Sequence, residues 1–512
     1  MKREDSLKKR YFFKLTTNII GGLVGMVTLA IVPRALGPTN YGNFTFVTQF
    51  FQQLISFYSV GSSIGFFTKL SQRNHDKGLI GFYGLVMFVV FALLLMTVIG
   101  VISTGYAEIV WPEQDIIIVV AGLVFALLMW GLQTCVQIAD AFALTISVEL
   151  IKLVQKLLST IILVIMAYVA ILNLETYFLF HYIVIGALIV ALIYFFIRRG
   201  VINQSDLRLN RNQMSAYIQE FYHYCAPLFI YNIVVLIGGL AQVWMLQHFA
   251  GSEQQGFFGL SYQIGAACFL FTSAMTPLLI REMAKAFAQK NKERMRSLFR
   301  RYIPMLYSVA AYFAVFISME ADKVVQIFGG EAYTDAIVVV IIMALYPIHQ
   351  TYGQLSGSVF YATDQTKLYS NIAVTMMPIG LAILYMLLAP TEQFGLELGA
   401  LGVAINMVGM QFIGVNIQLW FNTKYLGLSF LRFFAHQIVA LIFFISLAYV
   451  GINIGAWLAG NTSVITLFIM EGFCYTILVA LGAYLLPQLF SVTRTEINQI
   501  LMRVWQRLKP IE

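Results

Sequence analysis

The chain has 512 residues, of which 60% are apolar and only 11% are charged. Soluble domains carry about 25% charged residues, so this composition, with a mean hydropathy of +0.80, excludes a soluble enzyme. The net charge of +8 does not indicate nucleic acid as a partner, because the basic residues cluster beside apolar stretches, where anionic lipid would attract them.

The apolar stretches are long enough to cross a membrane. A helix needs roughly 20 residues to cross about 30 Å of hydrocarbon. The sequence therefore predicts an all-α integral membrane protein with fourteen transmembrane helices. The predicted spans, in chain order, are 13–33, 43–66, 79–103, 116–139, 146–171, 175–197, 225–248, 257–280, 302–320, 336–360, 368–389, 398–421, 434–457 and 463–486.

The charges of the gaps between spans predict the orientation of the chain. When the gaps are assigned alternately to two sides, only Arg34 and Lys323 of the 32 Lys and Arg residues fall on the second side. Lys and Arg in short loops stay in the cytoplasm, so both termini are predicted to be cytoplasmic. The long inner gaps around 198–224 and 281–301, and the stretch 497–509, are predicted to be amphipathic helices at the lipid headgroups.

No pattern of residues predicts catalysis, a metal or a cofactor. The chain has no Walker P-loop and no Ser/His/Asp set that can be placed at one depth. The four cysteines lie within or at the edge of apolar segments without the paired spacing of a zinc or redox site, and are interpreted as packing residues. They are Cys135, Cys225, Cys268 and Cys474.

The sequence contains an internal repeat. Residues 18–46 align without gaps on residues 232–260, and six spans separate the two copies, so both enter the membrane in the same direction. Parallel repeats of this kind form the two halves of some transporters. We therefore predict a six-helix lobe over 1–200, a linker and second parallel lobe over 201–424, and an extra helix pair with a basic tail over 425–512.

Several short motifs resemble those of bacterial polysaccharide repeat-unit flippases (Wzx-type). These flippases belong to the multidrug/oligosaccharidyl-lipid/polysaccharide exporter superfamily, with the multidrug and toxin extruders and the lipid II flippases. The resemblance extends over nearly the whole chain. It is carried by Pro33 to Pro38 with Tyr41 and Gly42, Pro277, Phe328 to Gly330 with Tyr333 and Ala336, Lys367 with Asn371, and Gly399 to Ala404.

The resemblance implies a flippase of the bacterial inner (plasma) membrane. Its substrate would be an undecaprenyl-pyrophosphate-linked oligosaccharide for O-antigen, capsule or exopolysaccharide, moved from the inner to the outer leaflet by alternating access. Membrane lipid and a polysaccharide polymerase or ligase would be its partners. The alternative is a cation-coupled multidrug or toxin antiporter, although the first span lacks an obvious acidic cation site. A membrane glycosyltransferase, polymerase or ligase is disfavoured by the short outer gaps.

Charged residues inside spans are the first candidates for the site, because each costs about 2.5–3.5 kcal/mol at the centre of a helix. Glu149, Lys152 and Lys156 share one face of the fifth span. This face is interpreted as a cationic stripe for phosphate or acidic sugar. Alternatively, Glu149 pairs with Lys152 and Lys156 snorkels. Asp140, at the end of the fourth span, is a further partner or an interfacial cap.

Other candidates are uncharged or lie at the ends of spans. Arg34 and His248 occupy matched positions in the repeat, where they are outer-gate contacts or cations that oppose a helix dipole. Polar side chains within spans should face the bundle interior and bind sugar or neighbouring helices. The polar side chains are Gln52, Asn232, Gln242 and Gln263, and the candidates for ion coupling are His181, His349 and Glu471.

Overall fold

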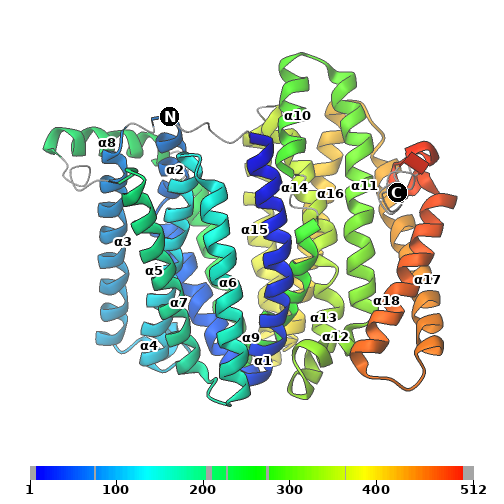
Figure 1. Cartoon of the computed structure of the whole chain (residues 1–512), viewed down its shortest axis with the longest axis horizontal. Coiled ribbons are helices and arrows are strands. Elements are labelled where there is room, and N and C mark those ends of the chain that lie inside the picture. Colours follow the sequence, from blue (N-terminus) through cyan, green and yellow to red (C-terminus); the bar gives the residue numbers. More distant parts are fainter. Residues whose placement is uncertain are drawn as a thin grey trace, which may run out of the picture. The chain divides into compact units, whose positions relative to one another are not determined.

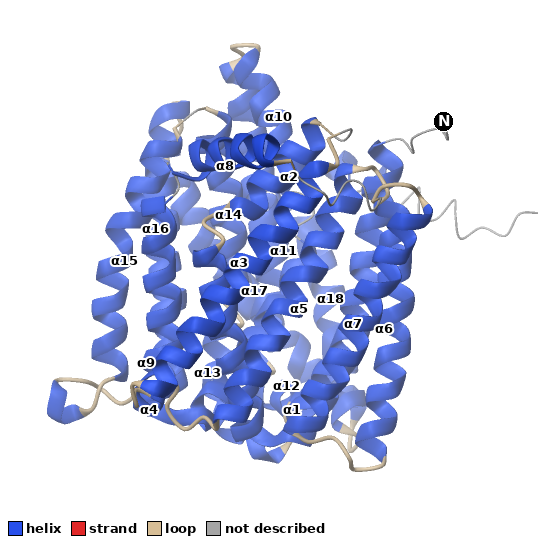
Figure 2. Cartoon of the chain, turned by 90° about the vertical axis from the view of Figure 1, so that its left-hand side faces the viewer, coloured by secondary structure: helices blue, strands red, loops and turns tan. Residues whose placement is uncertain are grey.

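The computed structural model describes residues 7–73, 76–202, 210–226, 229–271, 276–363, 365–496 and 498–499. Throughout this part of the chain every regular element is a helix (Figure 2). The chain forms two compact units, described separately below. Unit 1 contains Met1–Gly259 and Leu381–Ala400, and unit 2 contains Leu260–Gly380 and Leu401–Glu512.

Unit 1 is a bundle of long apolar helices around an aromatic core. Helices α5, α6 and α7 run side by side (Figure 1), and α5 and α6 also pack against α1. Phe46, Phe51 and Phe66 are fully buried in the core of this unit. Its helices are α1 (Leu7–Tyr58), α2 (Ser62–Gln72), α3 (Gly78–Ser103), α4 (Ala107–Val110), α5 (Ile116–Ala141), α6 (Thr145–Tyr168), α7 (Leu174–Arg198), α8 (Arg211–Cys225) and most of α9 (Phe229–Ala267).

Unit 2 contains the end of α9 and most of the remaining helices. Two of them, α17 and α18, pack very closely, because a Cβ on Gly451 or Gly455 would lie 2.7 or 2.5 Å from the Cα of Tyr475 or Glu471. Small residues four apart allow this approach in membranes. The helices are α10 (Thr276–Ala288), α11 (Lys292–Met319), α12 (Ala321–Phe328), α13 (Ile337–Met343), α14 (Tyr346–Ala362), α15 (Thr366–Leu388), α16 (Gly399–Leu426), α17 (Phe430–Ala459) and α18 (Val464–Leu485), of which α15 ends in unit 1.

The predicted all-α, multi-pass membrane fold is confirmed. Each of the fourteen predicted spans overlaps a described helix. Eleven helical segments among the described residues are long and apolar enough to cross a membrane, and the first of them, Ile19–Tyr58, overlaps two predicted spans.

The outer turn predicted between the first two spans is a single-residue break. Helix α1 continues through it except at Gly37 (φ 72°, ψ 168°), and α9 breaks in the same way at Gly251 (φ 79°, ψ −178°). A positive φ of this kind suits glycine, which has no Cβ. The two glycines are equivalent in the repeat, so both copies bend at the same position and with the same backbone conformation.

The two copies also meet symmetrically inside unit 1. A Cβ on Gly42 would lie 1.7 Å from the carbonyl oxygen of Ser252, and a Cβ on Gly256 would lie 2.1 Å from that of Pro38. Gly42 aligns with Gly256 and Pro38 aligns with Ser252, so each copy makes the same backbone contact with the other. These contacts support the internal repeat, while the lobe boundaries at 200 and 424 stay predictions.

The second and tenth predicted spans are interrupted. The helix of the second span ends at Tyr58, and the chain turns through Val60 (φ 46°) and Gly61 (φ 73°) before α2 begins. The tenth span is divided between α13 and α14, where Pro347 enters the first turn of α14. Proline has no N–H and cannot continue the hydrogen bonding of a preceding helix. The second and tenth predicted spans are therefore helical but each contains a break.

The predicted amphipathic helices have different outcomes. The gap 198–224 does contain a helix, α8, which buries Tyr217 and Phe221 on one face. The gap 281–301 contains two helices, the end of α10 and the start of α11, which bury Met283 and Phe299 in the core of unit 2, while a position at the headgroups stays a prediction. The apolar faces of both helices are therefore buried against protein. Of 497–509, only 498–499 lie within the described residues.

Candidate functional site

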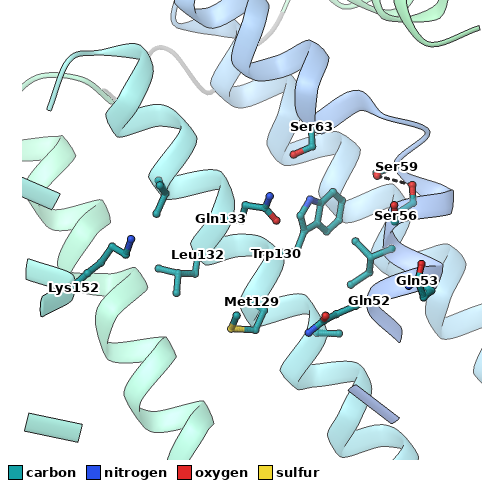
Figure 3. Close-up of a pocket in the computed structure, with 13 residues that line it drawn as sticks. Gln52, Gln53, Ser56, Ser59, Ser63, Met129, Trp130, Leu132, Gln133 and Lys152 are labelled. Atoms are coloured by element: carbon teal, nitrogen blue, oxygen red, sulfur yellow. Dashed lines mark hydrogen bonds between the residues drawn. The ribbon is translucent and has the colours of Figure 1, made fainter. Parts of the chain in front are cut away.

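A polar cavity of about 630 Å³ lies within unit 1 (Figure 3). Helices α1, α5 and α6 contribute to its lining, together with the turn between α1 and α2 and the start of α2. The lining residues are Gln52, Gln53, Ile55, Ser56, Ser59, Ser63, Ala126, Met129, Trp130, Leu132, Gln133, Val136 and Lys152.

Helical spacing and the interrupted second span place the polar groups. Gln52 and Ser56 are four residues apart on α1, and Met129 and Gln133 are four apart on α5, so each pair shares a helix face. Ser59 and Ser63 follow Gln52 at seven and eleven residues, so helical spacing keeps them on the same side although the helix is interrupted after Tyr58. Interrupted helices are a recurring feature of binding sites in transporters.

Several of these polar groups are available to a ligand. The side chains of Gln52 and Gln133 are exposed, and neither amide has a hydrogen-bond partner among the described residues. The hydroxyl of Ser59 donates to the carbonyl of Ser56 at 3.1 Å. The Ser63 hydroxyl accepts a hydrogen bond from Gln137 at 2.9 Å. The cavity therefore presents neutral donors and acceptors beside the indole of Trp130 (Figure 3).

The charge of Lys152, the one cation in the lining, is balanced by a neighbour. Its Nζ lies 3.0 and 3.2 Å from the two carboxylate oxygens of Glu149, whose side chain is only 5% exposed. The Glu149–Lys152 pair of the structural interpretation is therefore present. Glu149 itself is absent from the lining.

The charge of Lys156 is not balanced in this way. Lys156 lies near the middle of α6 and is half-buried against α1, where a Cβ on Gly25 would be 3.2 Å from its Nζ. The missing side chains of Gly21 and Gly25 leave the space that the ammonium occupies. No carboxylate among the described residues pairs with it. An unpaired ammonium at mid-span is expensive and is by default a functional candidate.

Arg34 and His248 lie three residues before the glycine breaks. Both are exposed, and the ring of His248 stacks on Trp244 at 4.5 Å. Neither lines the cavity. A carboxylate that was not predicted, Glu113, accepts hydrogen bonds from the backbone N–H (2.8 Å) and hydroxyl (2.9 Å) of Ser252 and so fastens the break at Gly251.

The remaining polar candidates are scattered. Asp140 accepts a hydrogen bond from the Thr145 hydroxyl at 2.8 Å across the turn between α5 and α6, as the interfacial interpretation expects. Gln242 is half-buried in α9, and Gln263 is exposed on the part of α9 that belongs to unit 2. The side chain of Asn232 lies outside the described residues. Of the four polar candidates, only Gln52 lines the cavity.

The two histidines proposed for coupling are surrounded by rings. His181 lies 4.5 to 5.8 Å from four aromatic rings, and its Nε2 has no hydrogen-bond partner among the described residues. His349 packs against Phe412 at 5.1 Å, and its Nδ1 likewise has none there. These surroundings agree with packing roles. Glu471 is different, because it lies in a buried charged group in unit 2.

The sequence analysis missed most of the cavity lining. Trp130, Gln133 and the serines of the α1–α2 turn were not selected, because no charge marks them. A signal was present in Ser56, Ser59 and Ser63 around Gly61, since a run of small polar residues and glycine is unusual in an apolar span.

Comparison with known proteins identifies the fold. No protein-family model and no curated protein matches the chain. Among solved structures, the chain is similar to an inward-facing multidrug resistance MATE family transporter of the MOP superfamily, with a TM-score of 0.63 and 12% identity over 81% of this chain and 98% of the other. It is also similar to the lipid II flippase MurJ in an inward closed conformation, with a TM-score of 0.62 and 13% identity over 93% and 99%.

A third similar structure is a MOP superfamily transporter from Pyrococcus furiosus, whose TM-score is 0.53 at 13% identity over 83% of this chain and 97% of the other. At identities this low the likeness shows the fold alone. The chain thus has the fold shared by MOP superfamily transporters, and its membrane-spanning character agrees with the eleven candidate spans.

Proposed function

We propose that the chain is a flippase for undecaprenyl-pyrophosphate-linked oligosaccharide repeat units. It moves them from the inner to the outer leaflet of a bacterial inner membrane by alternating access between two lobes, with both termini in the cytoplasm. The fold supports membrane transport, and one protein with this fold is a flippase of lipid II. The sequence motifs support the polysaccharide branch of the superfamily.

The observation that carries this proposal is the unpaired ammonium of Lys156 on the helix face whose other lysine, Lys152, lines a cavity of neutral polar groups. Lys156 lies one turn from Lys152 on the same face of α6, and Lys152 lines the cavity. A pyrophosphate needs cations, whereas sugar hydroxyls need amide and hydroxyl partners such as Gln52 and Gln133. Both kinds of group occur here within one unit.

The alternative, a cation-coupled multidrug or toxin antiporter, is equally compatible with the fold. It requires an essential carboxylate in the cavity. None of the thirteen lining residues is acidic, and the nearby Glu149 is occupied by Lys152. This difference favours the flippase. An enzyme of polysaccharide assembly is the least supported alternative, because the predicted outer gaps leave little room for a catalytic domain.

The test is complementation in a bacterium that lacks its own copy of this gene. A Lys152→Ala/Lys156→Ala variant should abolish surface polysaccharide, and its level in the membrane is measured alongside because the loss of Lys152 leaves Glu149 unpaired. Lys285→Ala removes an exposed lysine of α10 and should complement fully. Normal polysaccharide in the double variant would eliminate the cationic site. Altered drug resistance with unchanged polysaccharide would favour the antiporter.

A further inference from the structure

Unit 2 contains a buried triad of charged residues, Glu320, Lys323 and Glu471, which lies outside the cavity described above. Lys323 donates to Glu320 Oε2 at 2.5 Å and to Glu471 Oε1 at 3.1 Å. Glu320 lies between α11 and α12, Lys323 is on α12, and Glu471 is on α18. The triad therefore joins α18 to the junction of α11 and α12.

The triad is closed to solvent and its charges do not balance. The side chains of Glu320 and Glu471 are 2% and 1% exposed, and that of Lys323 is 17% exposed. Two carboxylates with one ammonium leave an excess of one negative charge. Burying an uncompensated charge is strongly unfavourable, and such groups take up or release a proton instead.

One oxygen of the triad lacks a hydrogen-bond donor. Glu471 Oε2 lies 3.0 Å from Lys323 Nζ, yet no donor among the described residues directs a hydrogen bond to it. Both carboxyl groups contact the same ammonium of Lys323, Glu320 at 2.5 Å and Glu471 at 3.0 Å. A proton on one carboxyl group would supply the missing donor, bridge the two carboxyl groups and neutralise the triad.

No other charged group in the described surroundings neutralises the excess negative charge of the triad. Helix α17 places Gly455 against Glu471, and Asp322 on α12 is exposed. One turn along α18, the hydroxyl of Tyr475 already donates to the carbonyl of Tyr312 at 3.0 Å. The excess charge is therefore left to a ligand.

We propose that the Glu320–Lys323–Glu471 triad is a proton-binding site that controls the contact between α12 and α18. Water supplies the proton, which binds a carboxylate oxygen and donates a hydrogen bond to the other carboxylate. When the proton leaves, the buried excess charge weakens the contact. Because α18 is locked to α17 through Gly451 and Gly455, the helix pair would move as one body. This site does not depend on which substrate is transported.

The test is infrared difference spectroscopy of the full-length protein in lipid nanodiscs without substrate, between acidic and alkaline buffers. Wild-type protein should lose the band of one buried protonated carboxyl group at alkaline pH. Glu471→Gln should abolish this band, because Glu320 and Lys323 then form a neutral pair. Glu320→Gln should abolish it for the corresponding reason and serves as the second variant if the first fails to fold. Asp322→Asn, an exposed neighbour on α12, should keep the band.

Thermal unfolding supplies an independent readout. The melting temperature of the wild type should fall from neutral to alkaline pH, and Glu471→Gln should remove most of this dependence. A carboxyl band that persists in both glutamine variants would overturn the proposal. A melting temperature that responds to sodium at fixed pH, with no response to pH, would overturn it in favour of a cation site. Neither result would contradict the proposed flippase function, which is tested separately by surface polysaccharide.

Discussion

The charged face of α6 in unit 1 and the triad of unit 2 are electrical opposites. On α6, two ammonium groups meet one carboxylate, so one positive charge is left over at Lys156. In the triad, two carboxylates meet one ammonium, so one negative charge is left over. Both lie in parts of the chain where an unbalanced charge is costly.

The surroundings of the two groups suggest how each excess charge is balanced. The face of α6 adjoins a cavity of about 630 Å³, which is large enough for part of a substrate that carries phosphate. The triad is nearly inaccessible, because the side chains of Glu320 and Glu471 are 2% and 1% exposed. A ligand for the first group is therefore an anion of some size, whereas the ligand for the second is a proton.

Removing Lys323 should have the largest effect on stability. Lys323→Met leaves two buried carboxyl groups without a cation, and breaking a buried ion pair in this way costs about 3–5 kcal/mol. The melting temperature should drop strongly at neutral pH and recover partly in acid, where both carboxyl groups are protonated. Lys323→Arg should behave like wild type. A melting temperature unchanged in Lys323→Met would mean that the ammonium of Lys323 does not compensate the two buried carboxyl groups.

Removing Lys156 should impair transport without destabilising the protein, in contrast to the removal of Lys323. Because its ammonium has no carboxylate to leave behind, Lys156→Met should keep or raise the melting temperature. A hydrogen bond to a charged group contributes about 1.5–3 kcal/mol, so the transport rate should fall on the order of 10- to 100-fold. The measurement combines surface polysaccharide with the melting temperature of the purified variant. A fall in both would mean that Lys156 has a structural partner.

Removing Lys152 from the same face of α6 should have an intermediate effect on stability. Lys152→Met leaves the buried carboxylate of Glu149 unpaired and should destabilise the protein by about 1–3 kcal/mol. Adding Glu149→Gln should restore much of this loss, and a double-mutant cycle gives the coupling energy of the pair. If the second change brings no recovery, Glu149 and Lys152 do not act as a pair.

The sequence predicted the helices better than their interruptions. Apolar length and loop charge were enough for the multi-pass helical fold, because the hydrocarbon thickness sets the length of a span. The outer turn at Gly37 was expected to be a loop of several residues, since hydropathy does not reveal how tightly two helices cross at Gly42 and Ser252. The breaks at Gly61 and Pro347 were missed for the same reason, as both lie within apolar stretches.

For the candidate site, the sequence selected charges and overlooked neutral groups. Glu149, Lys152 and Lys156 do lie together on α6, because helical spacing alone predicts which residues share a face. Trp130 and Gln133 could not be selected, because their positions depend on how α5 packs against α1. Glu471 and Lys323 are 148 residues apart in the sequence, so their pairing depends entirely on the tertiary structure.

An exposed ion cluster in unit 1 provides the smallest effect and the control for the other predictions. Arg73 donates to both oxygens of Glu220, at 2.9 and 2.7 Å, and Lys69 lies 3.0 Å from the same carboxylate. These groups are 25–37% exposed. Although partial burial opposes it, the hydrogen bonds from Arg73 and Lys69 hold the pKa of Glu220 below its usual range. Water screens such pairs, so each contributes little.

Glu220→Gln should lower the free energy of unfolding by about 0.2–1 kcal/mol. A carboxylate whose pKa is lowered by folding stabilises the protein above the usual glutamate pKa, and this contribution is lost as the pH falls through its folded value. The difference between Glu220→Gln and wild type should therefore disappear in acid and shrink in high salt. The triad is closed to solvent, so the effect of Lys323→Met should persist in high salt. Equal salt sensitivity of the two variants would mean that the triad is hydrated. The triad would then not differ from the exposed Glu220 cluster in its access to solvent.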